Sequence, residues 1–328
     1  MVNQIPILDL KDFLAGEPGA LEAAAADLRS ACENVGFYFI TGHGVPWSVM
    51  DGAFEASRRF HALPLEEKLK VKANEHNSGY MPSKTSISRA SKVYDGPKKN
   101  NLVAAFSVKR DLPPDHPDVL AGKRFRAANP WPENLPGFRE ACRDAMDALD
   151  GLAKSMLPLY AVALDLPANF FEEAFQEPQF SFRLAHYPPV EAEENQFGIA
   201  PHTDSSFMTL LAQNEVPGLQ IRPPDGDWID APVLPEAFLV NTGDLLHRWS
   251  NHRFRPTPHR ALPSAPGVDR YAIPFFFDAS NDFVMECLPT CHGPDNPPRY
   301  EPITYGEYME WFGRQNYAHF NEDRPAAE

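Results

Sequence analysis

The sequence predicts a mixed α/β (α+β) fold, in which helices precede a β-rich core and a further helix closes the chain. In the first half, apolar residues recur at three- and four-residue steps, as they do in amphipathic helices. After Glu177, short apolar and aromatic runs alternate with Pro, Gly and Asn, at intervals typical of β-sandwiches and barrels. The proline content, 34 of 328 residues, also suits many short strands better than an all-helical body.

Helical periodicity occurs in residues 21–34, 48–62, 64–68 and 136–164. The last of these helices is expected to pack against a sheet and to kink near Pro158. Short strands are predicted at residues 5–8, at an edge, and 37–40. Residues 76–101 lose periodicity, and surface excursions of this length often lie over binding sites.

The second half of the chain reads mainly as strands. We predict them at residues 181–187, 198–204, 208–213, 218–222, 238–243, 259–264 and 270–277. A helical pattern returns over residues 303–320 and ends the chain.

Composition and charge limit the classes of function. The chain is 43% hydrophobic and 12% aromatic, enough to bury a substantial core. It has no apolar run long enough to span a membrane and no signal-peptide pattern at its N-terminus, so we expect a cytoplasmic protein. The formal net charge of −15 disfavours nucleic acid and anionic lipid as partners, because both are bound through basic patches.

The cysteines do not indicate a disulfide framework. Cys32 and Cys142 fall on the apolar stripes of predicted helices, where we expect buried free thiols. Cys287, Cys291 and His292 have the spacing of half a zinc site, but the sequence holds no second pair that would complete four ligands.

One segment, residues 198–211, places a histidine and a carboxylate two residues apart, as His202 and Asp204. Residues i and i+2 of a strand project from the same face, so a metal ion between two sheets could take one ligand atom from each. Two histidines and one carboxylate on one face of an octahedron are the arrangement of non-haem Fe(II) oxygenases. The pattern therefore requires a second histidine from another strand.

The predicted strand region, residues 181–277, holds five histidines: His186, His202, His247, His252 and His259. His259 opens a strand-like segment after a turn, so it is the preferred third ligand, and His247 is the alternative. His247 and His252 lie in a polar, bulky loop, where surface or loop-bonding roles are expected. His43, between two glycines of a turn, is expected to bond to backbone.

A dicarboxylate co-substrate such as 2-oxoglutarate would chelate the metal through its keto-acid end and would need a cation for its distal carboxylate. Arg270 opens an apolar strand, where an arginine is costly unless it is paired, and its planar fork suits a carboxylate. The alternative is an edge arginine paired with a surface carboxylate. By strand alternation, one face is shared by Arg270, Ala272, Pro274 and Phe276.

Arg183 and Tyr187 share one face of the strand over residues 181–187. A tyrosine hydroxyl in this position could bond to the co-substrate. Both residues are equally compatible with ordinary structural hydrogen bonds.

With these residues in place, the chain resembles the isopenicillin N synthase-like family of iron(II)/2-oxoglutarate-dependent dioxygenases over nearly its full length. In the N-terminal half, the resemblance is carried by residues 5–10, 32–45 and 60–68. In the C-terminal half, it is carried by His186-Tyr187-Pro188-Pro189, His202-Thr203-Asp204, Gly218-Leu219-Gln220-Ile221, Asn241-Thr242-Gly243-Asp244, His259-Arg260 and residues 270–276.

The resemblance implies a distorted double-stranded β-helix (jelly-roll) core flanked by helices. An N-terminal region, residues 1–120, would pack on a jelly-roll catalytic region, residues 121–328, in one compact unit. The implied roles are Fe(II) binding by His202, Asp204 and His259, binding of the distal carboxylate of 2-oxoglutarate by Arg270 with Tyr187 nearby, and substrate contact by Phe276, to which we add Arg183.

The implied reaction uses dioxygen and decarboxylates 2-oxoglutarate to succinate while a small molecule is hydroxylated, desaturated or oxidatively cyclised. Ala272 departs from the family pattern Arg-x-Ser, so one hydroxyl hydrogen bond to the co-substrate is missing. A lost neutral bond is worth about 1 kcal/mol, so we expect weaker co-substrate binding and not its abolition.

Two other functions are compatible with these residues. One is an oxidase of the same fold that does not use 2-oxoglutarate, in which Arg270 would hold a substrate carboxylate. The absence of the family's serine at Ala272 is compatible with this function, and a lack of succinate among the products would identify it. The other is a non-catalytic metal or small-molecule binding module, which the intact triad disfavours. The sequence indicates neither a particular substrate nor an oligomeric state.

Overall fold

The computed structural model describes residues 5–88, 93–96, 98–224 and 226–316. Its largest sheet has the spatial order β1 (Ile7–Asp9), β2 (Phe37–Thr41), β10 (Phe238–Thr242), β7 (Met208–Gln213), β12 (Arg270–Ser280), β5 (Pro178–Tyr187), β4 (Ala104–Lys109) and β3 (Gly79–Met81). A smaller sheet has the order β6 (Ile199–His202), β11 (His259–Ala261), β8 (Leu219–Ile221) and β9 (Ile229–Ala231). β13 (Val284–Met285) pairs separately with β14 (Ile303–Thr304).

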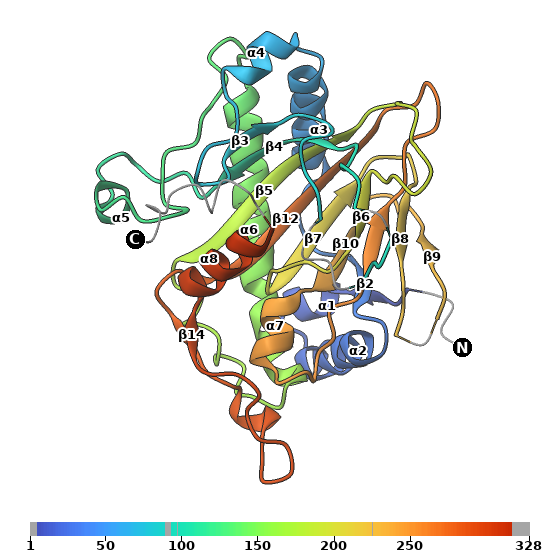
Figure 1. The fold of residues 1–328 in the computed structure, drawn as a ribbon. Coiled ribbons are helices and arrows are strands. Elements are labelled where there is room, and N and C mark those ends of the chain that lie inside the picture. Colours follow the sequence, from blue (N-terminus) through green and yellow to red (C-terminus); the bar gives the residue numbers. More distant parts are fainter. Residues whose placement is uncertain (1–4, 89–92, 97, 225, 317–328) are drawn as a thin grey trace, which may run out of the picture.

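The helices are α1 (Lys11–Leu14), α2 (Ala20–Asn34), α3 (Trp47–His61), α4 (Leu65–Leu69), α5 (Pro117–Leu120), α6 (Phe138–Ala163), α7 (Asp244–Trp249) and α8 (Tyr305–Asn316). The long helix α6 packs against α2, α3 and β12, and the ribbon shows it running along the large sheet (Figure 1). Its apolar stripe forms because buried residues recur at helical spacing, as Cys142, Met146, Leu149 and Met156 do.

Each face of the large sheet has its own apolar cluster. Side chains of α2, α3 and α6 pack on one face, in the cluster that contains Phe275 and Phe277. The opposite face meets the smaller sheet, as when Phe37 and Phe39 of β2 pack with Ile221 of β8. Two facing sheets backed by helices confirm the mixed fold and are consistent with a jelly-roll core.

Alternation along β12 decides which side chains face the smaller sheet. Ile273 and Phe275 belong to the helix-side cluster, whereas Ala272 clusters with Ala261 of β11. Arg270, Pro274 and Phe276 are each an even number of residues from Ala272 along the strand and so share its face.

Most predicted elements are present, and the differences have simple causes. β1 is an edge strand as expected, and Pro158 lies inside α6. The prediction of a loop after Gly243 is wrong, because Asp244–Trp249 forms the helix α7. This helix has only six residues, which are too few to show a helical period in the sequence. β3, β4 and β9 were not predicted, because they are short or adjoin polar segments. Residues 317–320 of the predicted C-terminal helix lie outside the described residues.

The strands of the first 120 residues are not a separate sheet. β4 pairs with β5 along its whole length, and β2 pairs with β10, so segments far apart in sequence build one surface. In the described part of the chain, the helices all lack the length or the apolar character that crossing a bilayer requires.

Candidate functional site

The smaller sheet brings two histidines and one carboxylate together. His202 at the end of β6 is directly opposite His259 at the start of β11, and the two imidazole rings are 4.3 Å apart. Oδ1 of Asp204 lies 3.7 Å from Nε2 of His202 and 3.5 Å from Nε2 of His259. One ligand atom from each residue lies within 4.8 Å of the others, so a single metal ion fits among them.

Backbone carbonyls orient both imidazole rings. Nδ1 of His202 donates to the carbonyl of Ala200 over 2.9 Å, and Nδ1 of His259 donates to the carbonyl of Thr257 over 3.2 Å. A proton held on Nδ1 leaves the lone pair of Nε2 directed at Asp204 Oδ1, which is how metal-binding histidines are usually fixed.

The carboxylate of Asp204 is held by residues that sequence reasoning did not identify. Its Oδ2 accepts hydrogen bonds of 2.8 Å from Thr209 Oγ1 and 2.8 Å from Asn241 Nδ2, which leaves Oδ1 facing the histidines. The backbone N–H of Asp244 also donates to the carbonyl of Asp204 over 2.7 Å. The sequence did single out the segment from Asn241 to Asp244, because this segment is one of those that carry the family resemblance.

The electrostatics of the triad favour the metal-binding forms of His202 and Asp204, whereas His259 must give up a proton to a bound cation. Burial, and then the proximity of His259, lowers the pKa of His202 to about 4, so its imidazole is neutral at pH 7. Burial alone would raise the pKa of Asp204, but His259 and His202 outweigh it and hold the pKa well below its usual range. Burial opposes a charge on His259, yet the charge and hydrogen bond of Asp204 raise its pKa.

A second feature is the buried guanidinium of Arg270. Its side chain is only 1% exposed, and Nη2 donates to Gln213 Oε1 over 3.0 Å. The guanidinium also lies 4.6 Å from the ring centre of Tyr187, the residue opposite Arg270 on β5. Its Nε and Nη1 have no hydrogen-bond partner, and it makes no ion pair with a described carboxylate. The alternative of an edge arginine paired on the surface is therefore wrong.

Mostly small side chains surround Arg270. Ala272, 2% exposed, clusters with Ala185, Ala261, Val103 and Tyr187, so most of these side chains are small. Gly218 approaches so closely that a Cβ there would lie 3.2 Å from Arg270 Cδ. Val103 also lines the large cavity described next, which connects this cluster to the metal-ligand cluster.

A cavity of about 790 Å³ opens over the triad. His202, Thr203, Arg183 and Ser107 form part of its sheet-side lining. Residues of the segment 73–103 form one wall, as expected for the excursion over residues 76–101. The remaining lining comes from α7, Pro256 and the C-terminal segment, with the side chains of Asp244, His247, Arg248, Tyr300, Tyr308, Trp311 and Phe312.

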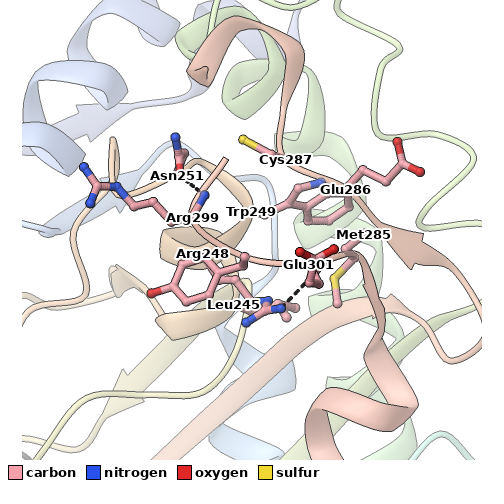
Figure 2. A pocket seen from close by; sticks show the side chains of 10 residues that line it. Leu245, Arg248, Trp249, Asn251, Met285, Glu286, Cys287, Arg299 and Glu301 are labelled. Carbon is pink, nitrogen blue, oxygen red and sulfur yellow. Dashed lines mark hydrogen bonds between the residues drawn. The ribbon is translucent and has the colours of Figure 1, made fainter. Parts of the chain in front are cut away.

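Hydrogen bonds attach the C-terminal wall to α7 and to the residues that follow this helix. Arg248 Nη2 donates to the carbonyl of Glu301 over 2.7 Å, and the N–H of Arg299 donates to Asn251 Oδ1 over 3.1 Å (Figure 2). Arg248 also lies 4.4 Å from the ring centre of Tyr300. These contacts place Tyr300 at the cavity.

Arg183 and Phe276 lie together on the same sheet face. The guanidinium of Arg183 lies 5.0 Å from the ring centre of Phe276, and Arg183 lines the cavity. Phe276 contacts Arg183 and is not itself part of the cavity lining.

The other histidines and the cysteine group lie outside the triad. His247 Nδ1 donates to the carbonyl of Phe254, and its ring stacks on His252 with centres 4.0 Å apart. His43 bonds to backbone through Nε2 and the carbonyl of Glu236, as predicted. Cys287 lines a small cavity next to Trp249 (Figure 2). Among the described residues, it belongs to no cluster of potential metal ligands.

Another group of potential ligands, His116, Asp118 and Glu177, is already compensated. Arg126 bonds to Asp118 over 3.0 Å and to Glu177 over 2.9 Å, and Lys123 lies 3.0 Å from Asp118. His116 Nδ1 accepts the N–H of Asp118. These contacts explain the cluster without a metal ion.

Comparison with known proteins agrees with this geometry. Residues 5–134 match the profile described as non-haem dioxygenase in morphine synthesis N-terminal, and residues 178–279 match that of the 2OG-Fe(II) oxygenase superfamily. The 2-oxoglutarate-Fe(II) type oxidoreductase hxnY of Emericella nidulans is 35% identical over 94% of this chain and 90% of its own. Kihadalactone A synthase LFS of Citrus sinensis is 32% identical over 94% of this chain and 92% of its own.

Among solved structures, a 2OG-Fe(II) oxygenase family protein from Caulobacter crescentus is 28% identical, with a TM-score of 0.81 over 95% of this chain and 99% of its own. The chain therefore belongs to the 2-oxoglutarate- and Fe(II)-dependent dioxygenase family. It is an oxidoreductase that uses Fe(II), 2-oxoglutarate and dioxygen. An oxidase of the same fold without 2-oxoglutarate, and a binding module without activity, are not favoured.

Proposed function

We propose that His202, Asp204 and His259 bind the Fe(II), and that Arg270 binds the distal carboxylate of 2-oxoglutarate. The donor set fits the metal, since two imidazoles and one carboxylate leave three positions open for co-substrate and dioxygen. When bound, Fe(II) supplies the activation of dioxygen that organic side chains cannot perform.

The observation that carries the proposal is the buried charge of Arg270. A guanidinium that is 1% exposed, with two unpartnered nitrogens and no described counter-ion, would be strongly unfavourable without an anion to pair with it. The distal carboxylate of the co-substrate supplies this anion. Tyr187 packs on the guanidinium and fixes its plane, and Gln213 fixes its direction.

The chain's own residues orient the reaction. Thr209 and Asn241 keep one oxygen of Asp204 occupied, so that the other is the metal ligand. The position of Ala272, where the family has a serine, lies in the cluster beside Tyr187 and contributes no hydroxyl. The distal carboxylate of the co-substrate is thus held mainly by Arg270.

The large cavity is the proposed substrate site. At about 790 Å³ it is within the usual range of small-molecule pockets, and His202 is in its lining. A small organic molecule bound there would be hydroxylated, desaturated or oxidatively cyclised. Arg183, with Phe276 packed against it, is the proposed substrate contact.

The test is an anaerobic titration of the Fe(II)-loaded protein with 2-oxoglutarate, followed by the visible charge-transfer band of the chelate. His259→Ala should abolish the band through loss of iron, and Arg270→Ala should weaken co-substrate binding with iron retained. Arg58→Ala, which removes an arginine from α3, is the matched control. Retention of a normal band in both site variants would contradict the assignments.

A further inference from the structure

Arg183 is a cation without a counter-ion on the surface of the large cavity. Its described contact is the ring of Phe276, and its buried Nε has no hydrogen-bond partner. No described carboxylate lies within ion-pair distance, although the chain has 45 acidic residues against 30 basic ones. The buried Arg126, in contrast, is paired with two carboxylates, Asp118 and Glu177.

The co-substrate cannot satisfy Arg183 as well as Arg270. Tyr187 lies opposite Arg270, and Arg183 precedes Tyr187 by four residues on the same strand, a separation of about 13 Å. A 2-oxoglutarate molecule with one end on the metal and the other on Arg270 leaves Arg183 free. Arg183 nevertheless lines the same cavity as the metal ligand His202, and its charge contributes to the lowered pKa of that histidine.

Lys109 adds a second cation on the same sheet face. Ser107 lies opposite Arg183 across β4 and β5, and Lys109 follows Ser107 by two residues, so it projects from the same side. Burial, and then the charge of Arg183, lowers the pKa of Lys109 to about 8. It forms no ion pair with a described carboxylate either. Arg183 of the cavity lining thus has a second cation behind it, although Lys109 is not itself part of the lining and Asp278 lies near enough to oppose part of the shift in its pKa.

The part of the lining that α8 supplies has a different character. Tyr308, Trp311 and Phe312 of α8 present aromatic surface, and Trp311 is 53% exposed. Aromatic side chains in such a position favour an apolar or ring-containing ligand. The cavity thus combines a cationic end with an aromatic wall.

We propose that the substrate is an organic carboxylate with an apolar body, whose carboxylate is bound by the guanidinium of Arg183, with Lys109 supplying additional positive charge. This inference rests on the proposed function only in taking the cavity as the substrate site. The planar fork of Arg183 donates two parallel hydrogen bonds to a carboxylate, and Phe276 holds the plane of the fork.

The experiment measures anaerobic binding to the Fe(II)- and 2-oxoglutarate-loaded protein by calorimetry. The probes are benzoate, phenylacetate, cinnamate, naphthoate and cyclohexanecarboxylate, each compared with its own primary amide. An acid and its amide have nearly the same shape, so the ratio of their dissociation constants isolates the charge. The proteins are the wild type, Arg183→Gln, Arg183→Lys, Lys109→Met and the control Arg58→Gln.

In the wild type, we expect at least one acid to bind roughly 10- to 100-fold more tightly than its amide, the range of a charge-assisted hydrogen-bonded pair. Arg183→Gln should bring this ratio close to one without changing the affinity for the amide. Arg183→Lys should restore part of the preference, Lys109→Met should reduce it several-fold, and Arg58→Gln should leave it unchanged. The dissociation constant of 2-oxoglutarate should not change in Arg183→Gln.

Three results would overturn the inference: no acid preferred over its amide by the wild type, equal losses for acid and amide in Arg183→Gln, or loss of 2-oxoglutarate binding in Arg183→Gln. The last result would assign Arg183 to the co-substrate. Repeating the series on metal-free protein separates this test from the proposed function. Failure of the wild type to bind 2-oxoglutarate would count against the role of Arg270 and not against that of Arg183.

Discussion

The hydroxyl of Tyr305 donates a hydrogen bond of 3.0 Å to Oδ2 of Asp278, while Oδ1 of the same carboxyl accepts the N–H of Phe207 over 2.8 Å. Both side chains are buried. One carboxyl thus connects the first residue of α8, whose aromatic side chains line the cavity, to β12 and to the turn that follows the metal-ligand segment.

This carboxyl should make stability depend on pH. Burial raises the pKa of Asp278 to about 7 from 3.8. Because the folded-state pKa lies above the unfolded one, the contribution to stability is fully present below 3.8 and is lost as pH rises through about 7. Asp278→Asn keeps an acceptor for the N–H of Phe207, offers an amide N–H to the hydroxyl oxygen of Tyr305 in place of the carboxyl oxygen, and does not titrate.

We therefore expect the free energy of unfolding of the wild type to fall relative to that of Asp278→Asn as pH rises from about 4 to 7, by at most about 1.4 kcal/mol per unit. Denaturant unfolding of the two metal-free proteins at several pH values measures the difference. Parallel pH curves would show that Asp278 titrates normally.

Gly243 should be required for the shape of the metal-ligand segment. A Cβ at this position would overlap the carbonyl oxygen of Ser206 and lie 2.8 Å from that of Asp204. Gly243→Ala should therefore lower stability and weaken metal binding at least tenfold, because the backbone that carries Asp204 must move. Gly151→Ala in α6 is the control, since a Cβ there has nothing within 4 Å and should raise stability by about 0.5–1 kcal/mol. Thermal unfolding and Fe(II) titration distinguish the two variants, and equal behaviour would refute the steric argument.

Ala272→Ser should tighten co-substrate binding. The residue shares the face and the cluster of Tyr187, so a serine hydroxyl would point to the region of the co-substrate carboxylate. One neutral hydrogen bond of about 1 kcal/mol corresponds to a roughly fivefold lower dissociation constant for 2-oxoglutarate. An anaerobic titration measures it. An unchanged or higher constant would mean that the hydroxyl finds no partner there.

Thr209 should influence the metal without contacting it. Thr209→Val keeps the shape of the side chain but removes the hydrogen bond to Asp204 Oδ2, and loss of such a supporting bond typically reduces metal affinity 10- to 100-fold. Thr290→Val also removes one hydroxyl bond, to the carbonyl of Leu164, far from the site along the chain. Competition with a chelator should show a loss of affinity in the first variant alone. A similar loss in both would reduce the effect to general destabilisation.

The parts of the site predicted from sequence are those fixed by local spacing. His202 and Asp204 are two residues apart, and His259 opens a strand, so their convergence needed only that these strands pair. The hydrogen bonds from Thr209 and Asn241 to Asp204 could not be predicted in this way, because they depend on the register of β7 against β10. α7 was missed because six residues give no measurable period.

Arg183 shows a different limit. Strand alternation predicts the face of β5 on which Arg183 lies. Whether Arg183 has a structural or a functional role depends on the residue that lies opposite it on the neighbouring strand. β4 supplies Ser107 there, and no carboxylate. Because β4 follows a polar segment and was not predicted as a strand, the absence of a counter-ion became visible only in the folded chain.

Different parts of the chain carry the catalytic groups and the walls of the cavity. Paired strands hold the triad and Arg270, whereas the segment 73–103 and residues 300–312 supply most of the walls. A lineage of such enzymes can therefore acquire a new substrate by changing wall segments that lie on either side of the ligand-bearing strands in sequence, while the oxidative machinery between these segments is inherited intact.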